Sequence, residues 1–146
     1  MCDAHEFVFD VDRAFADQLV VKMEASPEHP LAAPEAPRKF GVYVLYQHKN
    51  PVYVGQAVSP GGVAARLRDH LKKIERRSGI SVDDMTCRHL LIRQKWEVSR
   101  AETALIAQYK PTWQGIRGFS MHVAGAGRPG MPGYASQWDK RFPRLA

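Results

Sequence analysis

Two tyrosine-containing triplets in the first half of the chain have residue types and a spacing that could support catalysis. They are Gly41-Val42-Tyr43 and Tyr53-Val54-Gly55. Each places a phenol close to a glycine, which lets another group approach closely. The segments 40–46 and 52–54 are rich in aromatic and β-branched residues and predict strands, and the polar segment 47–51 predicts a turn. An antiparallel hairpin would bring both phenols to neighbouring strands, although such tyrosines are also common in simple packing.

A basic helix follows the hairpin and adds two further polar groups. The breaker at 59–62 predicts a helix that runs to about Arg77, with an apolar stripe that includes Leu67 and His70. Arg66 and His70 are four residues apart and therefore project from one face. Arginine offers a donor fork for phosphate oxygens, and histidine can move a proton near neutral pH. A phosphate site and a purely structural histidine both remain open at this point.

Glu102 supports two interpretations of the next predicted helix, which we expect to begin near Ser99 and to end before Pro111. Ser99 and Glu102 have the spacing of a capping box, which would explain the carboxylate without any catalysis. Glu102 also shares a face with Leu105, Ile106 and Tyr109, and an inward carboxylate is costly unless it is paired or bound to metal.

Composition favours a polyanionic partner. The chain of 146 residues has a net charge of +6 and a pI near 9.5, and six basic residues lie between Arg66 and Arg77 against Asp69 and Glu75. The alternative is a solvated basic helix face. No apolar run could cross a bilayer, and the acidic N-terminus does not resemble a secretory signal. With only Cys2 and Cys87 present, we expect no structural disulfide and a reducing cytoplasm.

The elements that must position these residues predict an α+β fold. A helix is expected over 11–24, and prolines at 27, 30, 34 and 37 predict an extended linker. A third strand is expected over 87–93, and the tail from Thr112 is expected to be irregular. The natural arrangement is a small antiparallel three-stranded sheet flanked by helices. We expect residues 1–37 to form an accessory helix and linker, and residues 38–146 to form one compact domain with C-terminal recognition loops.

The ordered set of residues resembles the GIY-YIG nuclease superfamily. The two triplets, Arg66, His70 and Glu102 occur in the order and spacing of that superfamily. Other segments resemble its small type II restriction endonucleases, and the likeness covers nearly the whole chain: 52–58 with Gly61-Gly62, Cys87-Arg88-His89-Leu90, Pro111-Thr112-Trp113, Gly118-Phe119 with His122 and Arg128, and Ser136-Gln137-Trp138-Asp139. One departure is Gln114, where the family usually carries an asparagine.

The resemblance implies metal-dependent hydrolysis of a DNA phosphodiester. Glu102 would hold one Mg²⁺ or Mn²⁺, Arg66 would brace a phosphate oxygen, and Tyr43 would be the general base or water-positioning group. His70 would accept a proton from Tyr43, and Tyr53 would bind the phosphate or the water. Gln114 would stand in the catalytic group in place of the asparagine, with its amide moved by one extra methylene.

The resemblance also implies a partner, which is double-stranded DNA cut at both strands. A homodimer on a palindrome is the simple arrangement, and the nearest relatives suggest a GC-rich target, CCGCGG. Candidate DNA contacts are Arg68, Lys72 and Lys73 on the basic helix, and Arg93, Lys95, Arg117, His122 and Arg128 in loops. Two alternatives stay open: a GIY-YIG nuclease of repair or recombination, and a DNA-binding module whose catalysis is weakened at Gln114.

Overall fold

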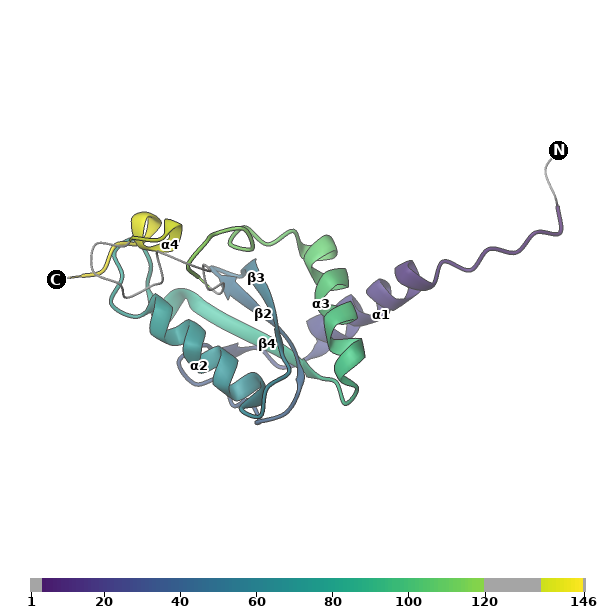
Figure 1. Ribbon diagram of the computed structural model, residues 1–146, viewed down its shortest axis with the longest axis horizontal. Coiled ribbons are helices and arrows are strands. Elements are labelled where there is room, and N and C mark those ends of the chain that lie inside the picture. Colours follow the sequence, from purple (N-terminus) through teal and green to yellow (C-terminus); the bar gives the residue numbers. More distant parts are fainter. Residues whose placement is uncertain (1–3, 120–134, 146) are drawn as a thin grey trace.

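The computed structural model describes residues 4–119 and 135–145 and shows a four-stranded sheet between helices (Figure 1). The elements are α1 (Val11–Ala25), β1 (His29–Pro30), β2 (Gly41–Gln47), β3 (Asn50–Ala57), α2 (Gly62–Ile74), a 3₁₀ turn (Val82–Asp84), β4 (Met85–Leu91), α3 (Lys95–Tyr109) and α4 (Gln137–Arg141). The α+β class, the long helices and the antiparallel hairpin are confirmed. Within the described ranges, no helix is long and apolar enough to span a membrane.

The sheet has the order β1-β4-β2-β3 and all of its pairs are antiparallel. The prediction of three strands was wrong by one, because His29 and Pro30 in the proline-rich segment pair with Cys87 and Thr86. Proline is tolerated there because β1 is an edge strand, where a missing N–H need not break a ladder. The opposite edge is β3, and this position decides where the functional residues meet.

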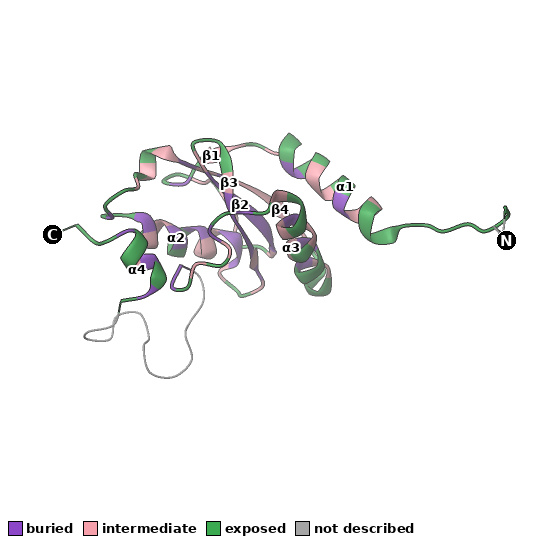
Figure 2. Cartoon of the chain, turned by 90° about the horizontal axis from the view of Figure 1, so that it is seen from above, coloured by how far each residue is buried: buried purple, intermediate pink, exposed green. Residues whose placement is uncertain are grey.

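The two faces of the sheet are covered by different elements, as the burial pattern in Figure 2 shows. The apolar stripe of α2 packs on the face that carries Tyr43 and Leu45. Helices α1 and α3 pack on the opposite face, around Val42 and Val44. Strand β2 is therefore buried on both faces, and side-chain alternation sends Tyr43 toward α2. A register shift between Leu45 and Tyr46 lets β3 direct both Val52 and Tyr53 to the same core.

Three predicted boundaries need correction. Helix α2 ends at Ile74 and not near Arg77, with Glu75 as its C-cap. Strand β4 spans Met85–Leu91, two residues earlier than predicted. Helix α3 begins at Lys95, so Ser99 lies inside the helix and donates to the side-chain oxygen of Gln56 at 3.3 Å. The proposed capping box at Ser99 and Glu102 was therefore wrong.

The tail is more regular than predicted at its end. Helix α4 begins with a capping box in which Ser136 and Asp139 satisfy each other's backbone N–H groups. The indole of Trp138 donates to the carbonyl of Lys73 at 3.0 Å, which fixes α4 against α2. This contact places the end of the chain beside the helix that carries Arg66 and His70.

Candidate active site at the edge of the sheet

The glycines of both triplets are required by close approaches. A Cβ on Gly55 would lie 2.2 Å from the hydroxyl oxygen of Tyr43, and a Cβ on Gly41 would lie 2.1 Å from the backbone oxygen of Leu90. Gly55 therefore lets the Tyr43 ring extend across β3, and Gly41 lets β2 approach β4. The sequence pattern thus reflects how the Tyr43 phenol reaches the edge of the sheet.

Tyr43 and His70 form the central contact of the site. The Tyr43 hydroxyl lies 2.7 Å from Nε2 of His70, and both residues are buried. Tyr53 packs beside them, with its ring centroid 4.9 Å from His70 and 6.4 Å from Tyr43. His70 lies on the apolar stripe of α2, as predicted, and only 1% of its surface is exposed. The structure therefore brings both tyrosines and the histidine together in a dry environment.

Burial sets the protonation of this pair. Burial raises the pKa of Tyr43 far above its usual value, although Arg66 opposes the shift. Burial, together with the charges of Arg66 and Lys73, lowers the pKa of His70 to about 3. Both side chains are consequently neutral at pH 7, and the imidazole tautomer sets which of them donates in the hydrogen bond between the phenol and Nε2.

Arg66 lies on the same face of α2, as its spacing predicts. It is half-buried, lies close to Tyr43 and is 3.8 Å from Asp69. Burial alone would lower the pKa of Arg66, but Tyr43, Tyr53 and Asp69 raise it on balance. The guanidinium stays charged and can serve an anion beside the phenol.

Glu102 reaches this group from the other side of the sheet. It lies on α3, which packs on the face opposite to α2, yet Arg66 is close enough to lower the pKa of its carboxyl. The two helices can converge because β3 is the edge strand. Burial is the larger effect and raises the pKa of Glu102. Among residues 4–119 and 135–145, no hydrogen bond or ion pair satisfies this half-buried carboxylate.

Glu102 is a suitable donor for a hard divalent cation. Within the described part of the chain no group of three or more His, Cys, Asp and Glu side chains gathers at one place. A metal at this edge would therefore have one protein carboxylate and would depend on water and substrate oxygens. Mg²⁺ commonly binds in that way, so the residues fit the ion.

The side chain of Gln114 is bound to the backbone of β3. Its Oε1 accepts from Val54 N–H at 2.9 Å, and its Nε2 donates to the Val54 carbonyl at 2.9 Å. Trp113 N–H also donates to the carbonyl of Val52 at 2.7 Å. The segment after α3 thus pairs with the outer side of β3, between Tyr53 and Gly55.

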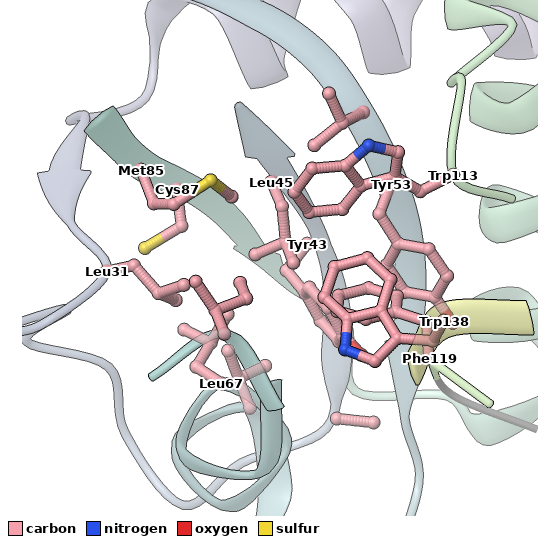
Figure 3. Close-up of a cluster of buried hydrophobic side chains, with 14 of the residues drawn as sticks. Leu31, Tyr43, Leu45, Tyr53, Leu67, Met85, Cys87, Trp113, Phe119 and Trp138 are labelled. Atoms are coloured by element: carbon pink, nitrogen blue, oxygen red, sulfur yellow. The ribbon is translucent and has the colours of Figure 1, made fainter. Parts of the chain in front are cut away.

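An aromatic cluster that the sequence did not predict packs against His70. Phe119 stacks on His70 with centroids 4.7 Å apart and meets Tyr53 edge-on at 5.0 Å. Trp113 and Trp138 continue the cluster toward α4 (Figure 3). These residues follow no helical or strand period, so only their aromatic character could have indicated a shared core.

The predicted DNA contacts are spread over several surfaces. Arg68, Lys72, Arg93, Lys95 and Arg117 are exposed, and Lys73 is half-buried. The prediction placed Lys95 in a loop, but it is the first residue of α3. His122 and Arg128 lie outside the described residues.

Several known proteins are similar to this chain. The UvrABC system protein C of Aquifex aeolicus (strain VF5) is 34% identical over 98 residues, which are 64% of this chain and 16% of that protein. The chain thus spans only a small part of that relative's length. The GIY-YIG N-terminal endonuclease domain of UvrC from Thermotoga maritima, bound to its catalytic magnesium, is 22% identical with a TM-score of 0.42, and the match covers 67% of this chain and 97% of that one. A point mutant of the same domain, bound to its catalytic divalent cation, gives the same identity and TM-score, with 67% and 96% covered.

The family itself is shown by a match of more than half of the chain. The sequence model of the Eco29kI GIY-YIG domain matches residues 59–144, a range that contains Arg66, His70, Glu102 and Gln114. Both tyrosine triplets precede this range, so their placement beside the matched residues is an independent structural observation. This chain therefore belongs to the Eco29kI family of GIY-YIG nuclease domains.

Proposed function

We propose that the chain is a divalent-metal-dependent endonuclease that hydrolyses phosphodiesters of double-stranded DNA. The observation that carries this proposal is the 2.7 Å contact between Tyr43 and His70, with Arg66 close to the same phenol and Glu102 close to Arg66. Three kinds of group therefore meet at one edge of the sheet. The neutral phenol can bind water, the charged guanidinium can bind phosphate, and the half-buried carboxylate can bind a metal ion.

In this proposal Tyr43 and His70 move the proton of the attacking water. The water oxygen bonds to phosphorus, and the bond from phosphorus to the 3′ oxygen breaks. The proton of the water passes to the Tyr43 oxygen as the phenol releases its own proton to Nε2 of His70. Because Arg66 contributes to the low pKa of His70, an anionic phosphate beside Arg66 offsets that charge and makes His70 a better acceptor.

The remaining residues bind and orient the substrate. Arg66 braces a non-bridging oxygen, Tyr53 hydrogen-bonds the phosphate or the water, and Glu102 holds Mg²⁺ or Mn²⁺. When bound, the metal polarises the phosphate and stabilises the leaving 3′ oxygen. Gln114 acts on β3 and not on the substrate, so we place it among the positioning residues.

The first test is nicking of supercoiled plasmid with and without Mg²⁺. We expect Glu102→Gln to lower the nicking rate by at least about a hundredfold, because the carboxylate that holds the metal is lost. Glu97→Gln on the same helix is the matched control and should cut like the parent. If Glu102→Gln cut as fast as the parent, the assignment of the metal ligand would be wrong.

We further propose restriction-type specificity, with a homodimer on a GC-rich palindrome such as CCGCGG. The match to the Eco29kI family supports this reading, and the likeness to UvrABC system protein C supports a repair nuclease instead. Discrete fragments from phage DNA would support restriction, and a smear would support the repair alternative. Binding without cleavage in any metal would support a module with weakened catalysis.

We also propose that the protein is located in a reducing cytoplasm. The free, buried thiol of Cys87 suits this compartment.

A further inference from the structure

A cavity of about 400 Å³ adjoins the proposed active site at Arg66 and His70. It lies between α2, the turn at Gly118 and Phe119, and α4. Arg66 and His70 line one wall, so the cavity is continuous with the group around Tyr43. The role assigned to Arg66 and His70 leaves the rest of this space unexplained.

The cavity has an excess of positive charge. Its lining includes Arg66, Lys72, Lys73, Arg77 and Arg144, and the carboxylates that oppose them are Asp69 and Asp139. Both carboxylates already have partners, since Asp139 pairs with Arg77 at 2.6 Å and Asp69 lies 3.8 Å from Arg66. Over residues 4–119 and 135–145, the side chains of Lys72, Lys73 and Arg144 form no ion pair.

Lys73 is the most constrained of these cations. Its ammonium is half-buried and donates to the backbone carbonyl of Gly118. Burial, Arg77 and Arg66 lower the pKa of Lys73, although Asp139 opposes them. An ammonium has three donors, and a partly desolvated one is stabilised by an anion that takes the donors left over.

We propose that this cavity binds a second backbone phosphate of the DNA strand, adjacent to the scissile phosphate at Arg66, with Lys73, Lys72 and Arg144 as its ligands. The inference rests on the proposed function, because it presumes a DNA strand at Arg66. A strand presents one phosphate for each 3.4 Å of helix axis, so a strand held at Arg66 brings a neighbouring phosphate to the adjoining cavity. Free inorganic phosphate has the same chemistry, and the test below separates the two.

This second phosphate would act on the reaction and not only on affinity. A strand held at two successive phosphates has its register fixed, which places the scissile bond against Tyr43 and Glu102. Loss of the contact should therefore lower kcat as well as weaken binding. Since phosphate contacts do not read bases, the loss should be similar for different DNA sequences.

The test combines a charge deletion in the DNA with a charge deletion in the protein. A cleavable duplex carries one neutral methylphosphonate, moved in turn through the phosphates on either side of the scissile bond. We expect one neighbouring position to slow cleavage by the parent on the order of tenfold, the size of one charge-assisted hydrogen bond. With Lys73→Gln, the penalty at that position should disappear, while penalties elsewhere remain.

Two further variants guard against a folding defect, since Lys73 also contacts Gly118. Arg144→Gln and Lys72→Gln change exposed side chains of the cavity and should each reduce the same positional penalty. Lys140→Gln, exposed on α4 and outside the lining, should leave every penalty unchanged. Equal penalties in the parent and in all three cavity variants would overturn the proposal. A second result would also overturn it: inorganic phosphate inhibits the parent but not Lys73→Gln, and no position in the DNA shows a penalty. The cavity would then be a site for free phosphate.

Failure of the proposed nuclease activity can be told apart from failure of this inference. If the parent cuts no DNA, the same set of duplexes and variants is measured by equilibrium binding. A positional penalty on affinity that Lys73→Gln removes would then support the cavity as a phosphate site of a binding module. Its absence there would reject the site.

Discussion

At the scale of single residues, Gly55 is a position where one added methyl group should harm both stability and activity. An added methyl would meet the Tyr43 ring, whose hydroxyl is held by His70. We expect Gly55→Ala to lower stability by about 1 to 3 kcal/mol and to reduce nicking strongly, because the ring must leave Nε2. Gly115→Ala is the control, since its Cβ would meet nothing within 4 Å. Thermal melts and nicking rates decide, and a Gly55→Ala enzyme with parental values would contradict this packing.

His70 should make stability depend on acid in a defined direction. Its folded pKa of about 3 lies below the ordinary value of 6.5 for an exposed histidine, so the unfolded chain takes up a proton first as pH falls. Stability due to neutral His70 is complete above pH 6.5 and is lost as pH falls toward 3. The loss at pH 4.5 should be on the order of 3 kcal/mol.

The measurement compares melting temperatures of the parent and His70→Gln from pH 7.5 to pH 4.5. The parent should lose more of its melting temperature over this range, because glutamine does not titrate. Glu102 titrates in both proteins and cancels in the comparison. Identical pH slopes would mean that the histidine is solvated and titrates normally.

At the scale of elements, the side-chain amide of Gln114 pairs with the backbone of β3 in the way a neighbouring strand would. We expect Gln114→Met, which keeps the length but loses both bonds to Val54, to lower stability by about 1 to 3 kcal/mol. It should lower kcat more than it changes KM, because Tyr53 and Gly55 shift while substrate contacts remain. Hydrogen exchange at the Val54 amide should accelerate. Gln108→Met, exposed on α3, is the control, and an unaltered exchange rate at Val54 would contradict the role.

The same elements show what local sequence could and could not predict. Alternation and turn residues predicted β2 and β3, and the i, i+4 spacing predicted Arg66 and His70 on one face. The beginning of α3 was placed too late because Ser99 has a capping side chain, whereas burial of Val98 and Ala101 decides the helix. Pairing of β1 depends on a partner about 57 residues away, and local patterns carry no such information.

The core around Phe119 illustrates the same limit for the site. Trp113, Phe119 and Trp138 come from irregular segments or a short helix, so no periodicity groups them before the chain is folded. The role of Gln114 was equally hidden, because an amide can pair with substrate or with backbone and its type does not distinguish them. Sequence predicted the chemistry of the central residues, and tertiary packing determined their supports.

At the scale of the whole molecule, one chain offers one such site, and a duplex has two strands to cut. We expect two chains on each palindromic duplex, related by a twofold axis that matches the DNA. Light scattering after size-exclusion chromatography, with the Glu102→Gln variant to prevent cleavage, measures this ratio. A duplex with one half-site scrambled is the control and should bind one chain. A ratio of one chain per intact palindrome would contradict the homodimer.

The pairing of Gln114 with β3 also bears on self-association. An edge strand with free N–H and C=O groups is a template on which the strand of another molecule can add. Gln114 and Trp113 occupy groups of Val54 and Val52 that such a strand would need. These two residues take up hydrogen-bonding groups of β3 where a further strand would add, so the edge strand that carries Tyr53 resists growth into an intermolecular sheet.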